Sequence, residues 1–255
     1  MASHDRFGFE WAKYKNIHPQ YEEQFKNWVS PLTPKDFKDR AVLDAGCGMG
    51  RNSFWALSWG AKRLQAFDYG QASVGAAKEN LKEFSNAKVS HESIYDIKYE
   101  NEFDIAMSIG VIHHLKDPKL AVKNLIRALK PGGRLVVWVY GKDGYGRLVT
   151  TFVDPVRKNI TSRLPIKLVH FISYLISAPL WVFVKIFRGP GKLFKQFSTF
   201  PLWHVHSIVF DHLLPEVANY WDESEVRDLV VSSGVSRVEV LRPPHGWGWT
   251  LLVTK

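Results

Sequence analysis

The chain has 255 residues, enough for one domain with a substantial insertion or for two small domains. Its 34 Lys and Arg against 25 Asp and Glu give a formal charge of +9, which suits an anionic partner such as a nucleic acid, a lipid surface or a phosphorylated substrate. The single cysteine excludes an intrachain disulfide and suits a reducing compartment, and the N-terminus lacks the basic and apolar regions of a secretory signal. We therefore expect a cytoplasmic globular protein.

The first 39 residues are rich in aromatic and polar side chains, and the periodicity of QYEEQFKNWV predicts a short helix that packs as an arm or lid. From residue 40 onward, short apolar runs alternate with helical patterns. Strands are expected over 40–46, 63–68, 87–92, 103–109 and 134–140, and helices over 52–59, 71–84 and 118–130. This alternation is typical of a parallel α/β sheet that is buried on both faces.

The alternation stops at Gly141 and resumes with a predicted helix over 222–234 and two strands over 237–242 and 247–254. The intervening residues 142–221 form an insertion that is too long for a plain connection. Its first part, 142–200, holds ten Lys and Arg against two Asp, nearly the whole positive excess of the protein. We therefore divide the chain into an arm (1–39), a core (40–141), a basic and apolar cap insertion (142–221) and the final helix and strands of the core (222–255).

The segment VLDAGCGMGRNS (42–53) places a G-x-G-x-G turn directly after the first strand and before a helix. Glycines let the backbone turn sharply and approach a ligand, and a helix N-terminus favours negative charge. A dinucleotide fingerprint would need glycine where Arg51 stands, so a Rossmann dehydrogenase fits less well. Asp68 ends the second strand, where a carboxylate can accept hydrogen bonds from ribose hydroxyls. The alternative is a tight turn with Asp68 as a helix cap.

Four segments together carry a family resemblance: LDAGCGMGRNS, FD at 67–68, FDIAMSIGVIHHLKDP (103–118) and LKPGGRLVVWVY (129–140). With them the chain resembles the class I S-adenosylmethionine-dependent methyltransferases, in the small-molecule group with the type 11 domain. The resemblance covers about 40–140 and, more loosely, 222–254. It implies a Rossmann-like seven-stranded sheet of order 3-2-1-4-5-7-6 with strand 7 antiparallel, and a mainly helical cap.

The resemblance also implies S-adenosyl-L-methionine as cofactor and S-adenosyl-L-homocysteine as product. It places the methionine part on the glycine loop, ribose on Asp68 and adenine beside Tyr69. Ser93 and Ile94 stand where the family often has an Asp-Ala pair, so here a serine hydroxyl replaces the carboxylate. The arm commonly closes over the cofactor in this group, although hydrophobic packing would equally explain its aromatic residues. The implied cofactor residues are Trp11, Tyr14, Asp44, Ala45, Gly46, Cys47, Gly48, Gly50, Asn52, Asp68, Tyr69, Ser93, Ile94, Ser108, Ile109, Gly110 and His113.

Methyl transfer from a sulfonium is an in-line displacement, for which positioning and the exclusion of water are the main requirements. A general base is needed only if the acceptor must lose a proton. The candidate catalytic residues are His113, His206 and Asp211, with a purely positional role as the alternative for His113. The candidate substrate residues are Tyr145, Trp203, His206 and Asp211. On a strand His204 and His206 would point the same way, but no further cluster with ligand spacing accompanies them, so no metal is expected.

We expect a small or amphipathic methyl acceptor, lipid-like or a natural product, because the cap insertion is both basic and apolar. The alternatives are the same reaction at an anionic membrane surface, methylation of RNA, or a non-catalytic cofactor-binding module. Nucleic acid is not expected as a partner, since the basic segment is dense in apolar runs and shows no recognisable RNA-binding module. The oligomeric state is not predicted.

The stretch KLVHFISYLISAPLWVFVK (167–185) is the least ordinary part of the insertion, because 168–184 contain no Asp, Glu, Lys or Arg. As one helix these residues would reach only about 26 Å, below the ~30 Å thickness of the hydrocarbon core. Pro179 favours a break at Ala178, and a polar stripe of His170, Ser173, Tyr174 and Ser177 follows helical spacing. We predict two short helices of a cap, with insertion into a membrane interface or across a membrane as the alternatives.

Overall fold

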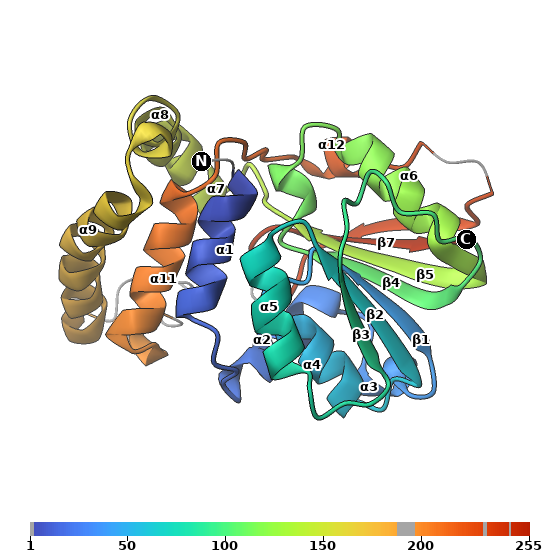
Figure 1. The fold of residues 1–255 in the computed structure, drawn as a ribbon. Coiled ribbons are helices and arrows are strands. Elements are labelled where there is room, and N and C mark those ends of the chain that lie inside the picture. The colour runs from blue at the N-terminus through green and yellow to red at the C-terminus, as the bar shows by residue number, and fades with distance from the viewer. Residues whose placement is uncertain (1–2, 188–196, 232–233, 245) are drawn as a thin grey trace.

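The computed structural model describes residues 3–187, 197–231, 234–244 and 246–255, and its centre is one seven-stranded sheet. The strands follow the order β3-β2-β1-β4-β5-β7-β6, and β7 runs antiparallel to both of its neighbours (Figure 1). The predicted fold class is thereby confirmed. The strands are β1 (Ala41–Ala45), β2 (Arg63–Asp68), β3 (Ala87–His91), β4 (Phe103–Ile109), β5 (Leu129–Val139), β6 (Arg237–Leu241) and β7 (Trp249–Thr254).

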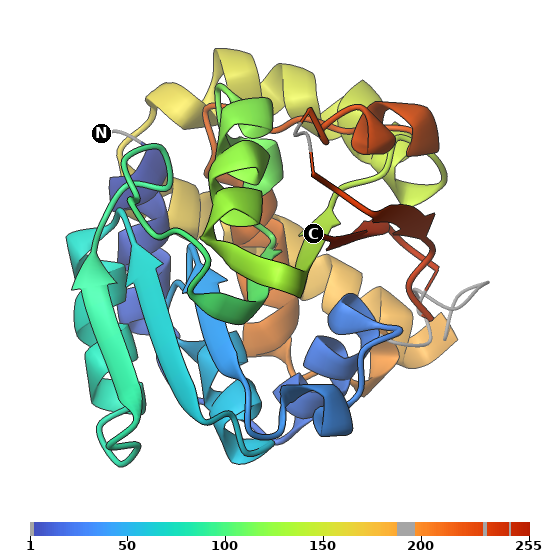
Figure 2. The same ribbon diagram turned by 90° about the vertical axis from the view of Figure 1, so that its right-hand side faces the viewer.

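Helices cover both faces of the sheet, as the turned view in Figure 2 shows. α6 (Pro118–Ala128) and α12 (Glu223–Arg227) bury apolar side chains against one face, and α2 (Gln20–Val29), α4 (Arg51–Ser58) and α5 (Gln71–Asn80) against the other. Helix α3 (Pro34–Phe37) adds Phe37 to the second layer, and the described α-helices outside both layers are α1 (Ser3–Lys13), α7 (Tyr145–Leu148), α8 (Asp154–Asn159), α9 (Ile166–Phe187) and α11 (Leu202–Leu213). Because the central strands β1, β4 and β7 lie between two apolar layers, they are buried on both sides, as their continuous apolar runs predicted, whereas the edge strands β3 and β6 are partly exposed.

Strand β5 begins at Leu129, five residues before the predicted start. Leu129 already pairs with Phe103, and a register shift between Phe103 and Ile105 accommodates the Pro-Gly-Gly sequence inside the strand. A Cβ at Gly133 would lie only 2.9 Å from the carbonyl oxygen of Lys130, so glycine permits this irregular start. Sequence reasoning placed a stop at these residues because Pro and Gly more often end an element.

The cap insertion is helical, and its two longest described helices, α9 and α11, pack on one another. Figure 1 shows α1 between α11 and α5, so the N-terminal arm joins the cap to the core; contacts with both helices agree. Two local predictions were wrong here. Helix α9 runs unbroken through Pro179, and His204 and His206 lie on helix α11 rather than on a strand. Residues two apart on a helix point in nearly opposite directions, so a shared metal site for these histidines has no geometric basis.

Candidate active site

The glycine loop lies between β1 and α4 and has a backbone that only glycine adopts freely. Gly46, Gly48 and Gly50 have φ values of +77°, +55° and +82°. A Cβ at Gly46 would approach Val111 to 2.5 Å, so the loop and the segment after β4 are in close contact. The Gly48 amide donates a hydrogen bond to Asp68 Oδ2 (2.9 Å), and the Gly70 amide donates to Oδ1 (2.8 Å). The Asp68 carboxylate is therefore fixed beside the loop at the carboxyl end of β2.

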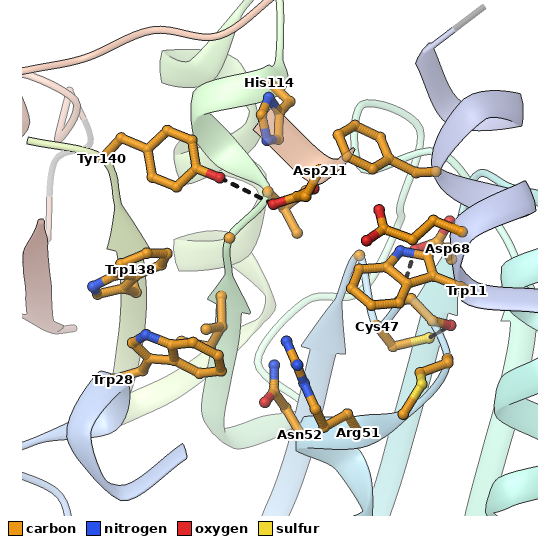
Figure 3. A pocket seen from close by; sticks show the side chains of 18 of the residues that line it. Trp11, Trp28, Cys47, Arg51, Asn52, Asp68, His114, Trp138, Tyr140 and Asp211 are labelled. Atoms are coloured by element: carbon orange, nitrogen blue, oxygen red, sulfur yellow. Dashed lines mark hydrogen bonds between the residues drawn. The ribbon is translucent and has the colours of Figure 1, made fainter. Parts of the chain in front are cut away.

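A cavity of about 820 Å³ extends from this loop to the cap. Figure 3 shows Trp11, Cys47 and Asp68 on one side of it, Trp28, Trp138 and Tyr140 on the opposite side, and Asp211 between them. Gly110, at the carboxyl end of β4, also lines the cavity, and a Cβ built there would meet nothing within 4 Å. Glycine at this position keeps open a space that a side chain would fill. The volume lies within the range of about 300–1,000 Å³ typical of small-ligand sites.

Arg51 supplies a cation to the wall of this cavity. Its guanidinium carbon lies 4.7 Å from the ring centre of Tyr21, 5.1 Å from that of Trp28 and 5.6 Å from that of Trp11. Aromatic faces attract a guanidinium, so these rings hold Arg51 in place. Trp11 also lies against the glycine loop, because a Cβ at Gly48 would be 3.1 Å from its Nε1. The arm thus covers the loop and contributes to the cation site in the same place.

Two carboxyl groups face the cavity from the arm and the cap. Glu10, on α1, is 2% exposed, and Asp211, on α11, is partly buried. Burial raises the pKa of Asp211 to about 6, while Arg51 and a hydrogen bond from Tyr140 Oη (3.4 Å) act in the opposite direction. Burial and the neighbouring Asp211 raise the pKa of Glu10 well above its usual range. Burial thus favours the protonated form of Glu10 more than in a free glutamate, whereas a pKa of about 6 leaves Asp211 mostly ionised at neutral pH.

The far wall of the cavity is aromatic. Trp28 from α2 and Trp138 from β5 have ring centres 5.4 Å apart, and Trp247 lies 5.1 Å from both Trp138 and Tyr140. All four side chains line the cavity. Rings at such separations form faces on which a flat, unsaturated ligand can stack. This wall lies opposite the glycine loop, so a single cavity offers two different environments.

Twelve of the seventeen predicted cofactor residues line the cavity: Trp11, Tyr14, Gly46, Cys47, Gly48, Asn52, Asp68, Tyr69, Ser93, Ile94, Ile109 and Gly110. The other five, Asp44, Ala45, Gly50, Ser108 and His113, do not. Ser53 Oγ donates to Asp44 Oδ2 (2.6 Å), and Ser108 Oγ donates to the Ala45 carbonyl (2.9 Å). These buried groups hold the loop from behind rather than facing a ligand.

The predicted catalytic histidines lie away from the cavity. His113 is fully buried and stacks on Tyr140 with ring centres 3.7 Å apart, and burial lowers its pKa well below the usual range. His206 is also fully buried, and its Nδ1 lies 2.9 Å from Tyr14 Oη. Both imidazoles thus pack inside the protein, because the chain turns their neighbours His114 and Ser207 to the cavity instead. The structure does not support these two as groups that reach an acceptor.

Of the predicted substrate residues, some line the cavity and others do not. Asp211 lines the cavity, whereas Trp203 lies outside it and packs on His18 with ring centres 4.7 Å apart. Tyr145 begins helix α7, but its side chain is outside the described part of the structure. Among the described residues no group of three or more His, Cys, Asp or Glu could hold a metal ion.

Sequence reasoning missed Glu10, Trp28, Arg51, His114 and Tyr140. One signal was available for Trp138 and Tyr140, since residues two apart on a strand share a face. Arg51 was considered only as a departure from the dinucleotide fingerprint. Nothing local connects Glu10 to Asp211, because the arm and the cap meet only in the folded chain.

The chain resembles known methyltransferases in sequence. Residues 43–137 match a family model described as a methyltransferase domain. The chain is 35% identical over 135 residues to a tRNA U34 carboxymethyltransferase of Helicobacter acinonychis, covering 51% of this chain and 50% of that protein. A protein of the same name from a Sulfurovum species is 30% identical over 146 residues, or 56% of this chain and 48% of that one. The chain thus spans about half the length of the curated relatives it matches.

Solved structures share the fold over most of the chain, although their sequence identity to it is low. A Burkholderia thailandensis 1,6-didemethyltoxoflavin-N1-methyltransferase with bound S-adenosylhomocysteine gives a TM-score of 0.55 at 16% identity, covering 92% of this chain and 79% of that one. A magnesium protoporphyrin IX methyltransferase from Synechocystis gives 0.55 at 14% identity, covering 92% and 83%. At this identity the likeness concerns the fold.

The expectation that nucleic acid is not a partner was wrong, because the curated relatives are named as tRNA-modifying enzymes. It relied on the absence of an RNA-binding module in the chain, which says little when the match covers only about half of those relatives. The predicted methyltransferase domain is confirmed by the match over residues 43–137, and both of these solved structures, which share the fold, contain bound S-adenosylhomocysteine. Residues 43–137 of the chain thus match a methyltransferase domain, and the chain has the fold of known S-adenosylmethionine-dependent methyltransferases.

Proposed function

We propose that this protein transfers a methyl group from S-adenosylmethionine to an acceptor held against the aromatic wall of the cavity. The observation that carries the proposal is the continuity of one cavity, from the glycine loop and Asp68 to Trp138, Tyr140 and Asp211. S-adenosylmethionine, when bound, supplies a methyl carbon that is already activated toward displacement. The protein then needs to align the acceptor and exclude water, and the arm, which lines the cavity, would help to do both.

The residues present fit this cofactor. Gly46 and Gly48 line the cavity without a side chain, and the Asp68 carboxylate, fixed by two amides, would accept hydrogen bonds from ribose hydroxyls. Arg51 is a fixed cation beside the loop and would hold a carboxylate in the cavity. Asp211 would take the proton that an acceptor oxygen or nitrogen loses as it attacks, because it faces the cavity and is mostly ionised at neutral pH.

We infer that the acceptor atom is carried by a flat ring, and that an RNA base is the first acceptor to assay. The four aromatic side chains of the wall support a ring, and the names of the curated relatives support RNA. A base that reacts inside this cavity must leave its stack and enter it, which single-stranded loops allow at a cost of a few kcal/mol. The aromatic wall would repay part of this cost by stacking.

Cofactor binding is tested with Asp68→Asn, and Glu100→Gln at an exposed position serves as the control. A hundredfold excess of S-adenosylmethionine over its Kd should raise the Tm of the wild type and the control by about 5–10 °C. Asp68→Asn should lose most of this rise while its own Tm without ligand stays close to that of the wild type. Equal protection of Asp68→Asn would contradict the role of this carboxylate.

The acceptor is tested with tritiated methyl donor offered to total tRNA and, separately, to a small-molecule and lipid extract. We expect the label to be recovered with the tRNA, and we expect ribonuclease to release it. Label only in the extract would overturn the RNA acceptor and leave methyl transfer standing. No label in any fraction, despite cofactor binding, would contradict catalysis by this chain.

A further inference from the structure

Helix α9 buries a polar stripe among apolar side chains and exposes large apolar side chains on its other side. Its buried residues are the polar His170, Ser173 and Ser177 and the apolar Ile166, Val169 and Val184. On the outward side Phe171 is 61% exposed, Leu175 64% and Ile186 66%. Water-exposed helices of globular proteins show the opposite arrangement, with the apolar stripe toward the core. Exposed apolar side chains gathered along 22 residues therefore indicate an interaction surface rather than scattered exposure.

The polar inner face fixes the helix in this orientation. Tyr14 Oη lies 3.1 Å from His170 Nε2 and 2.9 Å from His206 Nδ1, and His206 Nε2 lies 3.1 Å from the His170 carbonyl. These hydrogen bonds join α9 to the arm and to α11. Rolling the helix to hide its apolar side would leave these buried polar groups without partners, at a cost of roughly 1–3 kcal/mol each. The apolar face thus stays outward.

Positive charge accompanies this face. Lys167 and Lys185 are exposed near the two ends of α9, and Lys158 and Arg163 are exposed just before it. Lys158 and Arg163 also line a small cavity of about 310 Å³ together with Arg6. Cations beside an apolar helix face are the composition with which amphipathic helices bind anionic lipid headgroups and the adjoining acyl region.

We propose that α9 docks on an anionic lipid bilayer, with its apolar face in the interface and its polar face on the protein. α9 is the one described helix long and apolar enough to cross a membrane, reaching about 33 Å at ~1.5 Å per residue. Its bonds to the arm and to α11 keep it on the molecule, so it lies along the membrane plane. Phe152, Val156 and Ile160, exposed in the segment before α9, extend the apolar surface.

Vesicle co-sedimentation of the whole protein tests this docking and needs neither cofactor nor acceptor. We expect binding to vesicles of phosphatidylcholine and phosphatidylglycerol (3:1) at low salt, and weaker binding in high salt or to phosphatidylcholine alone. Leu175→Gln with Ile186→Gln should lower the partition coefficient about tenfold or more, since each side chain loses apolar insertion. Leu120→Gln with Val231→Gln, two exposed apolar residues elsewhere, is the matched control and should bind as the wild type does. Circular dichroism melting verifies that both double variants fold.

Five outcomes would overturn the proposal. The first is no pelleting with anionic vesicles at low salt, and the second is equal pelleting of the α9 variant. A dimer in sedimentation velocity that the α9 variant dissociates would assign the face to a second copy of the chain. Retardation of tRNA that the α9 variant abolishes would assign it to RNA. Resistance of the bound protein to alkaline carbonate extraction would indicate a span, which contradicts docking in the plane.

Discussion

Asp211 is the residue whose charge most directly links the cap to the chemistry of the cavity. Its carboxyl group has a pKa raised to about 6, chiefly by burial. A base must be ionised to accept a proton, so the kcat of methyl transfer should rise with pH through about 6 and level off above 7. Asp211→Asn should lower kcat by about 10²–10⁴-fold and remove this acidic limb. An unchanged limb in single-turnover assays would exclude Asp211 as the base.

Tyr140→Phe is the conservative partner for this measurement. The Tyr140 hydroxyl donates to Asp211 Oδ2 and thereby helps to lower the pKa of that carboxyl. Without it the acidic limb should move to higher pH while the plateau rate stays within a few fold, since the aromatic ring remains. A structural defect would instead lower the plateau and leave the limb in place.

At the scale of elements, the core could be predicted from the sequence and the cap could not. β1, β2 and β4 are short apolar runs, and the pattern of each predicts a strand. The glycine loop identifies which strand comes first. Their order in the sheet came from the family resemblance, not from the pattern. The cofactor side of the site followed because its residues lie in the loops after these strands.

The secondary structure of the cap could not be predicted where tertiary contacts outweighed the local preference of the sequence. Pro179 removes one backbone donor, yet α9 continues because its turns on both sides pack on α11 and the arm. His204 and His206 were considered on a strand, where they would point the same way, but their segment forms helix α11 and buries Val205, His206 and Phe210. The polar stripe of α9 was correctly identified by its spacing. Its inward direction depends on Tyr14 and His206, which are distant in sequence.

The whole molecule carries two sets of buried ionisable groups that respond to pH in opposite directions. Burial lowers the pKa of His114, His170, His204 and His212 to about 4, and lowers those of His113 and His206 as well. The unfolded chain binds protons at these histidines below about pH 6.5, so their contribution to stability is lost as pH falls.

The buried carboxyl groups act the other way. Burial raises the pKa of Asp44 to about 7 and that of Asp211 to about 6, and that of Glu10 also rises. The folded protein holds these protons where the unfolded chain has already released them. Their contribution is complete below about pH 4 and is lost as pH rises toward 7.

Between pH 5 and 6.5 the six histidines outnumber the three carboxyl groups, so unfolding should take up protons on balance. We expect the free energy of unfolding of the ligand-free protein, measured in urea, to rise from pH 5 to pH 6.5 and to change little above 7.5. Asp44→Asn removes one opposing carboxyl group and should make this rise steeper, whereas Glu100→Gln at the surface should leave it unchanged. A maximum of stability near pH 5 would show that the carboxyl groups dominate, and that the histidines of the cap gain charged partners below neutral pH.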